Sequence, residues 1–251
     1  MIVAAHQPHY LPWLGYLAKV AAADLFVVMD DLQYEAQNFQ NRNRIKCNHG
    51  PLWLTVPLMH GAQCDRISDK RIVNLGSARH HWQRRHFETL RIHYQGAPHW
   101  RDYESALRDV YSRQWNRLID LDLHLLQLHL QWLDIRKPVL LSSSLGLTGQ
   151  KTDRIAALCR AVGADTYLSG GGGSRGYLDV AQLARAGVSV QWQTFTHPHY
   201  AQRYPRLGFT SHLGALDLVL NCGPQSRDVL AQAVAQSSAP ASVSLSTAAM
   251  R

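Results

Sequence analysis

Apolar and polar residues at the start of the chain follow the pattern of a β-α-β unit. Residues 1–5, MIVAA, form a short apolar run with β-branched members, which is typical of a buried strand. Residues 14–24, LGYLAKVAAAD, are rich in helix formers, and residues 25–31, LFVVMDD, are a second apolar run that ends in two acids. Such units place parallel strands under a helix, so this segment predicts an α/β fold.

The same alternation returns near residue 137. KPVLLSSSLG begins a second α/β half, and TDRIAALCRAVGA predicts a helix with Thr152 as its N-cap and Gly163 after its last turn. Residues 165–195 then have the pattern of a strand, a glycine loop, a helix and a strand. We therefore predict a Rossmann-like parallel sheet flanked by helices.

The segment between the two halves interrupts this alternation. Residues 33–46, QYEAQNFQNRNRIK, are polar and predict irregular structure, whereas residues 51–58, PLWLTVPL, resemble a strand with prolines at its ends. Residues 77 to about 136 predict a helical insertion of two or three helices, and residues 236–251 predict a disordered tail. The expected organisation is one α/β domain over residues 1–235 with this insertion.

Charge and composition narrow the classes of partner. The chain has 26 Lys and Arg against 18 Asp and Glu, a formal net charge of +8 and a pI near 9.5, which favours anionic partners. The basic residues are scattered and match no nucleic-acid-binding module, so no nucleic-acid partner is expected. The sequence shows no apolar run of about 18 residues, no basic leader and no CxxC pair among its four cysteines. We expect no membrane span and a cytoplasmic location.

The turn after the first strand, AAHQPHYLPWLGY, is unusually polar and aromatic. A histidine at the carboxyl end of a parallel strand can bind phosphate or act as an acid or base, because its pKa lies near neutral pH. The alternative is that His6 and Gln7 only satisfy backbone groups in a turn stiffened by Pro8 and Pro12.

The stretch QNRNRIK is the best anion-binding candidate. Arg42 and Arg44 alternate with Asn41 and Asn43, so an extended backbone would place both arginines on one side and both amides on the other. Arginine forks bind phosphate or carboxylate through two hydrogen bonds. The alternative is an exposed polar loop, or ion pairs with the acids that end the second strand.

Those acids, Asp30 and Asp31, would lie at the same sheet edge as His6. Two carboxylates there could hold Mg²⁺ beside a phosphate, or one of them could cap a helix. No spacing typical of a protein metal site is visible elsewhere, so we assign no metal ligands, although separate histidines could converge on a metal in the folded chain.

Two further segments carry polar groups after strands. In YLSGGGGSRGYLD, glycine backbone N–H groups with Ser169, Ser174 and Arg175 could cradle a phosphate, or the glycines could form a flexible turn; the segment is not a P-loop. THPHYAQRY resembles the opening turn in its chemistry, so the two proline-stiffened turns could face one pocket.

Taken together, HQPHYLPWLGY, DDLQY, QNRNRIK, KTDRIAALCRAVGADTYLSG, HPHYAQRY and LDLVLNCG resemble the WbqC-like family of bacterial proteins over about residues 1–230. The chain departs from the family pattern in its run of four glycines before Ser174. The positions that match are His6, Gln7, Tyr10, Asp30, Asp31, Gln33, Tyr34, Gln40, Asn41, Arg42, Asn43, Arg44, Ser169, Gly170, Tyr177, His197, Tyr200, Gln202, Asp217 and Asn221.

The resemblance implies transfer of an acyl or aminoacyl group, with glycyl as one case, to an amine in surface-polysaccharide or natural-product biosynthesis. The acceptor would be a nucleotide-linked amino sugar or a small metabolite, and the donor a phosphopantetheine-linked thioester on an acidic carrier protein. His6, Asp30, Asp31 and Asn41 are the predicted catalytic residues. The other matching positions, except Gln202, Asp217 and Asn221, are predicted to bind substrate together with Ser174.

Specific roles follow for the acyl-transfer hypothesis. His6 would be the general base for the attacking amine, Arg42 and Arg44 would hold diphosphate or phosphopantetheine, and Asn41 or Asn43 would stabilise the oxyanion. The strand, His-containing turn and LG helix start also resemble nucleotidyltransferases of the HIGH-motif class, which implies ATP with Mg²⁺ as an alternative. The chain has Trp13 to Tyr16 where that class has its second histidine. A non-catalytic module that binds nucleotide sugars is the third hypothesis.

Overall fold

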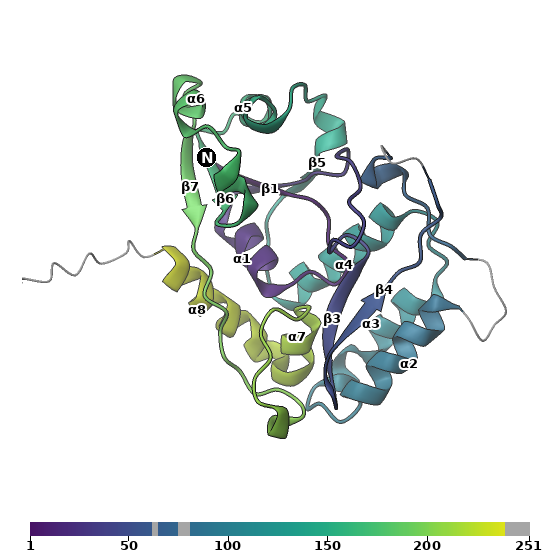
Figure 1. Cartoon of the computed structure of the whole chain (residues 1–251). Coiled ribbons are helices and arrows are strands. Elements are labelled where there is room, and N and C mark those ends of the chain that lie inside the picture. Colours follow the sequence, from purple (N-terminus) through teal and green to yellow (C-terminus); the bar gives the residue numbers. More distant parts are fainter. Residues whose placement is uncertain (62–64, 75–80, 239–251) are drawn as a thin grey trace, which may run out of the picture.

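A parallel sheet lies at the centre of the molecule (Figure 1). The computed structural model describes residues 1–61, 65–74 and 81–238, and over these residues the sheet has five strands in the order β5-β2-β1-β6-β7. All four pairings are parallel, which confirms the predicted Rossmann-like α/β class. The strands are β1 (Ile2–His6), β2 (Leu25–Val28), β5 (Val139–Leu141), β6 (Thr166–Gly170) and β7 (Ser189–Gln193).

Helices cover both faces of this sheet because successive strand residues point to opposite sides. On one side, Ala4 and Phe26 pack against α1 (Leu14–Ala22), α4 (Leu118–Trp132), α7 (Leu216–Cys222) and α8 (Ser226–Ser238). On the other side, Val3 and Val27 pack against α5 (Lys151–Val162) and α6 (Val180–Arg185). The central strands are therefore buried on both faces, as their continuous apolar sequences require.

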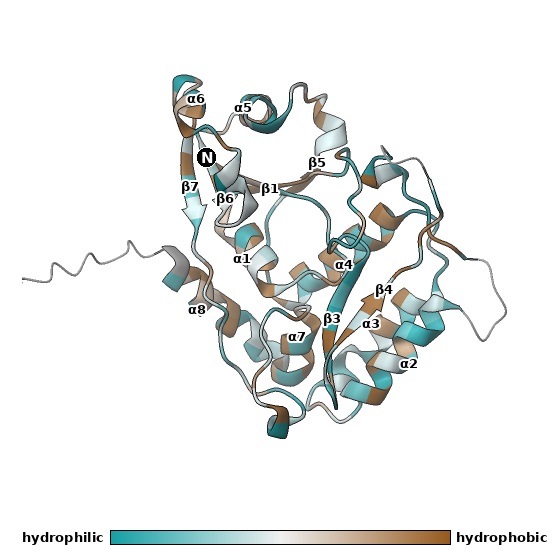
Figure 2. Cartoon of the chain, viewed as in Figure 1, coloured by the Kyte–Doolittle hydropathy of each residue, from teal (hydrophilic) through white to brown (hydrophobic). Residues whose placement is uncertain are grey.

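A second, antiparallel sheet stands beside the first, formed by β3 (Arg42–Cys47) and β4 (Gly50–Thr55). The prediction of irregular structure was wrong for residues 42–46. β3 is hydrophilic in composition beside the more apolar β4 (Figure 2), yet its alternate residues Asn43 and Ile45 are buried. The strand forms because the buried amide finds backbone partners, which a polar sequence does not reveal by itself.

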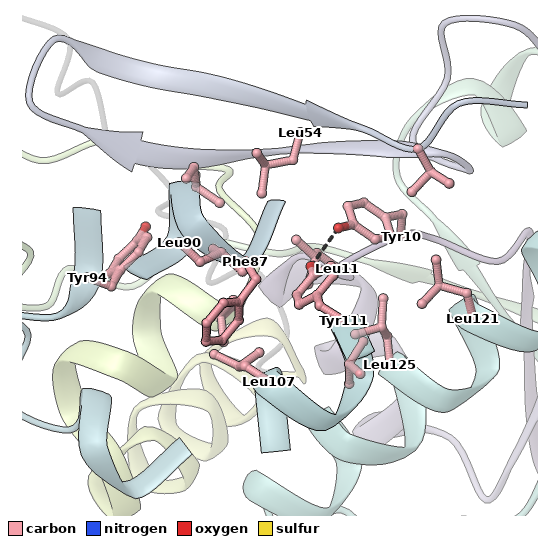
Figure 3. Close-up of a cluster of buried hydrophobic side chains, with 14 of the residues drawn as sticks. Tyr10, Leu11, Leu54, Phe87, Leu90, Tyr94, Leu107, Tyr111, Leu121 and Leu125 are labelled. Carbon is pink, nitrogen blue, oxygen red and sulfur yellow. Dashed lines mark hydrogen bonds between the residues drawn. The ribbon is translucent and has the colours of Figure 1, made fainter. Parts of the chain in front are cut away.

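Three described helices, α2 (Trp82–Tyr94), α3 (Trp100–Ser112) and α4, occupy the segment predicted to be a helical insertion, whose residues 77–80 lie outside the described residues. With the inner face of the hairpin they enclose a second core, seen in Figure 3. α4 contributes to both cores, since Leu125 faces the hairpin core and Leu126 faces the sheet core.

Two local predictions need correction. The N-cap of α5 is Gln150 rather than Thr152, whose hydroxyl donates to the carbonyl of Tyr177 and accepts from the N–H of Asp179. Thr152 thus ties α5 to the turn before α6. Gly163 does end α5, with a φ of 69° that favours glycine.

The prediction of a disordered tail was wrong for its first three residues. α8 runs to Ser238, so residues 236–238 are helical, and residues 239–251 lie outside the described residues. Among the described helices, none combines the length and the apolar character that crossing a bilayer requires.

Candidate functional site

The order in which the strands are added to the sheet reverses between β1 and β6. The chain leaves β1 through α1 on one face of the sheet, whereas it leaves β6 through α6 on the other face. In open α/β sheets this arrangement opens a crevice beyond the carboxyl ends of the two strands, where ligands bind. His6 ends β1 and Gly170 ends β6, so two predicted site residues meet at this position.

His6 is held in one orientation by the turn that follows it. Its Nδ1 lies 3.1 Å from the carbonyl oxygen of Gln7, so Nδ1 carries the proton and donates it there. Its ring lies against His9 and Tyr16, with centroid distances of 4.8 and 5.2 Å. Burial, with the nearby charge of Lys19, holds the pKa of His6 well below its ordinary value. The imidazole is therefore neutral at pH 7, with a basic lone pair on Nε2.

Lys19 is a site residue that the sequence predictions missed. It lies on α1 and is only 5 % exposed, and burial lowers its pKa to about 8. Its Nζ approaches the end of β6 so closely that a Cβ on Gly170 would lie 3.2 Å from it. Lys19 lies one helical turn after Tyr16, which contacts His6, and this i, i+3 spacing was the available signal.

A row of ring contacts joins His6 to the hairpin. His9 packs on Phe39 at 5.5 Å, and Phe39 packs on Trp53 of β4 at 5.8 Å. His9 is 5 % exposed and burial lowers its pKa to about 3, so it is neutral as well. Trp53, in contrast, is 42 % exposed, which makes it the solvent end of this row.

The hairpin arranges its arginines and amides as the alternation predicted. Arg42 and Arg44 lie on the outer face, with their guanidinium carbons 4.4 and 5.6 Å from the ring of Trp53. Asn41 and Asn43 lie on the buried face. The amide of Asn41 donates to the carbonyl of Val56 at 2.9 Å.

Asn43 connects the hairpin to the opening turn. Its amide donates to the carbonyl of Leu11 at 2.6 Å, while its Oδ1 accepts from the N–H of Arg44. A parallel link is made by two predicted site residues, since the amide of Gln40 donates to the side-chain oxygen of Gln7 at 2.9 Å. The QNRNRIK stretch and the His6 turn are thus one rigid unit.

The acids after β2 face the carboxyl end of β5. Asp30 accepts from the N–H and hydroxyl of Ser143, at 3.0 and 2.7 Å. Asp31 pairs with Arg154 of α5, an arginine outside the QNRNRIK stretch. Burial raises the pKa of Asp31, but the hydrogen bonds from Ser142 and Arg154 outweigh burial and lower it. A Mg²⁺ ion here would have to displace Arg154, and the described residues contain no group of three or more His, Cys, Asp or Glu arranged for a metal.

His197 reaches the opening turn through other aromatic residues. It donates from Nδ1 to the carbonyl of Pro198 at 3.0 Å, as His6 does to the next carbonyl, and its Nε2 is buried. The ring lies 5.4 Å from His212, which stacks on Trp13 at 5.4 Å. The two turns therefore share one surface at Trp13, while no contact joins His197 to His6 in the described structure.

Other predicted site residues lie elsewhere. The hydroxyl of Tyr10 bonds Tyr111 at 2.6 Å inside the hairpin core, as Figure 3 shows. Tyr200 donates to the buried Asp217 at 2.9 Å. Gln33 and Tyr34, together with Asn41, line a cavity of about 700 Å³ next to Lys70.

The glycine segment after β6 places its polar residues apart. The side chain of Ser169 lies on the sheet face opposite Gly170, fully buried and with an unpaired Oγ among the described residues. Ser174 is in a short 3₁₀ turn, Gly173–Gly176, and Tyr177 is exposed.

Comparison with known proteins agrees with the motifs in these elements. The model of the WbqC-like protein family matches residues 7–229. The uncharacterized protein Rv1507c of Mycobacterium tuberculosis is 32 % identical over 232 residues, which cover 91 % of this chain and 96 % of that protein. No solved structure matches the chain. The chain belongs to the WbqC-like protein family.

Proposed function

We propose that this protein transfers an acyl or aminoacyl group from an activated donor to an amine, with the reaction at the end of β1. The observation that carries the proposal is the neutral His6, whose Nδ1 is committed to the carbonyl of Gln7. That bond fixes the ring and leaves Nε2 as a hydrogen-bond acceptor at the sheet edge where ligands bind in such folds.

A neutral imidazole can serve as the base in this reaction. When the amine nitrogen attacks the carbonyl carbon of a thioester, the C–N bond forms and the nitrogen becomes positively charged and acidic. Neutral His6 then accepts its proton on Nε2. Collapse of the tetrahedral intermediate breaks the C–S bond, and the protonated imidazole returns the proton to the departing thiolate. Because burial keeps His6 neutral at pH 7, the base is available without prior deprotonation.

The outer face of the hairpin supplies anion binding in this proposal. Arg42 and Arg44 present two guanidinium groups beside the exposed ring of Trp53, a combination that suits a diphosphate attached to a flat or apolar group. Asn41 and Asn43 already donate to backbone carbonyls, so we assign them to holding the hairpin in place rather than to the oxyanion.

The test is transfer measured by mass. Aminoacyl carrier proteins, including glycyl, are incubated with nucleotide-linked amino sugars and small amines, and acceptors are searched for the added acyl mass. His6→Ala is expected to lower turnover by about a hundredfold or more, as loss of a general base does. His49→Ala, which removes an exposed histidine from the hairpin turn, is the matched control and should keep full activity. An active His6→Ala enzyme would exclude this role.

The parallel sheet, whose strand order reverses between β1 and β6, also favours a second candidate, an amide ligase that first forms an acyl-adenylate from ATP. Release of AMP and diphosphate with free carboxylic acids would identify it. Binding of nucleotide sugars without turnover in either assay would identify a non-catalytic binding module.

A further inference from the structure

Lys19 brings a positive charge to the carboxyl ends of β1 and β6. Its side chain is 5 % exposed, and no carboxylate of the described residues forms an ion pair with it. The groups around it are the neutral rings of His6 and His9 and the backbone at Gly170. A buried cation without a countercharge is costly, and such groups gather where a ligand supplies the opposite charge.

The glycine stretch beside Lys19 is more open than packing requires. Gly171 is needed because a Cβ would lie 2.9 Å from the carbonyl of Gln193. In contrast, a Cβ on Gly172 or Gly173 would meet nothing within 4 Å, and neither residue has a positive φ. Gly172 has φ −88° and ψ −128°, outside the regions that other residues favour, so its own conformation explains that glycine. Neither a positive φ nor local packing explains Gly173. Bare backbone that a ligand can approach closely does explain it.

His9 adds an unsatisfied group next to the cation. Its Nδ1 is buried and has no hydrogen-bond partner in the described structure, although the ring is fixed between His6, Tyr16 and Phe39. A ligand oxygen or its bound water would satisfy this nitrogen. The site thus combines an ammonium group and an unpartnered imidazole nitrogen beside exposed glycines, a combination that matches an anion with several oxygens.

We propose that Lys19 anchors a phosphate group of the substrate between the end of β1 and the glycine stretch 170–173. The phosphate belongs either to a nucleoside diphosphate or to phosphopantetheine. This site deepens the proposed function, since it places a phosphate-bearing substrate beside His6. Phosphate binding is measured without turnover. The site can therefore be tested even if the transferase hypothesis proves wrong.

Isothermal titration with inorganic diphosphate tests the shared chemistry. Lys19→Met keeps the length and apolar stem of the side chain and is expected to raise the Kd at least tenfold. Lys137→Met removes one lysine just before β5, away from the crevice, and should change the Kd less than twofold. Equal weakening in both variants, or no binding to the unmodified protein at about 10 mM diphosphate, would overturn the proposal.

Two further arms sharpen the result. Gly170→Ala places a methyl group against Nζ and should weaken diphosphate binding several-fold in a folded protein, which is checked by its thermal transition. If the wild-type protein binds a nucleoside diphosphate more tightly than Gly170→Ala does, and the two bind phosphopantetheine equally, the site belongs to the nucleotide. The reverse assigns it to the carrier arm, and undiminished diphosphate binding by both Lys19→Met and Gly170→Ala rejects the site.

Discussion

Lys19 holds its charge inside the protein at a cost in stability. Burial takes its pKa from 10.5 to about 8. At 1.36 kcal/mol for each pKa unit, this shift corresponds to about 3 kcal/mol of free energy of unfolding, taken as an upper value. A residue that costs this much is not there to stabilise the fold.

Replacement of this lysine should therefore stabilise the free protein. A basic group whose pKa is lowered in the folded state binds fewer protons when folded, so stability rises with pH between about 8 and 10.5. Lys19→Met is expected to raise the free energy of unfolding at pH 7 by about 1–3 kcal/mol, with a smaller gain near pH 10. Urea unfolding at the two pH values measures both numbers.

The contrasting variant is Lys70→Met. Lys70 is also buried but forms an ion pair with Asp65 at 2.8 Å, so its removal leaves a carboxylate without its partner and should destabilise the protein. A loss of stability in Lys19→Met as large as in Lys70→Met would show that Lys19 has an interaction that offsets its burial.

Affinity for phosphate should fall at alkaline pH. The ammonium form of Lys19 binds the anion, and in the free protein this form is lost as pH rises through about 8. A nucleotide-linked sugar is a suitable probe because the charge of its diphosphate diester does not change in this range. Its Kd is expected to rise about tenfold between pH 8 and pH 9.5. The reason is that the fraction of Lys19 in the ammonium form falls toward a tenfold loss for each pH unit above the pKa. A flat profile would mean that Lys19 does not bind the diester.

The sequence predicted the positions of some side chains at the site but not of others. His6 was predictable because a strand end in a parallel sheet fixes the position of its last residue. Lys19 was not, because LGYLAKVAAAD has the appearance of an amphipathic helix with one solvated lysine. Its burial depends on Gly170, which lies far away in sequence. Tyr10 and Tyr200 gave a similar difficulty, since their hydroxyl partners Tyr111 and Asp217 come from distant helices.

At the scale of elements, the hairpin depends on side-chain hydrogen bonds on its buried face. Its buried face contains Asn43, fully enclosed and bonded to the carbonyl of Leu11. The pattern of apolar residues predicted the helices and the central strands. It did not predict β3, because the inward positions of this strand alternate between an amide and an isoleucine. A buried amide supports a strand only when carbonyls of another segment lie opposite, and that is a property of the tertiary structure.

Asn43→Ala should therefore destabilise the protein by about 1–3 kcal/mol, because buried backbone groups lose their partner. Asn48→Ala, at the exposed turn of the same hairpin, should change stability by less than about 0.5 kcal/mol. Denaturant unfolding measures both. Similar values for the two variants would contradict the structural role of Asn43.

In the whole molecule, two cores share two helices. α4 and α7 each contribute side chains to the hairpin core and to the sheet core, for example Leu125 and Leu126 of α4. The hairpin and the sheet consequently cannot lose their packing independently. This sharing makes one cooperative unit out of two cores.

Leu125→Ala and Leu126→Ala test that coupling. Each substitution should lower the free energy of unfolding by about 2–5 kcal/mol. In each variant, the unfolding transition seen by the near-ultraviolet signals of tyrosine and tryptophan should shift together with the transition seen in the far ultraviolet. If the near-ultraviolet and far-ultraviolet signals gave different unfolding midpoints in either variant, the two cores would unfold independently.

The strand order also has a consequence during synthesis. β1 is made first, but its partner β6 begins only at Thr166, with roughly 160 residues in between, or on the order of ten seconds of translation. For that time the apolar edge of β1 that faces β6 has no strand to pair with on the ribosome. Unpaired strand edges attract other chains, so the nascent chain passes through an interval in which it is prone to aggregate.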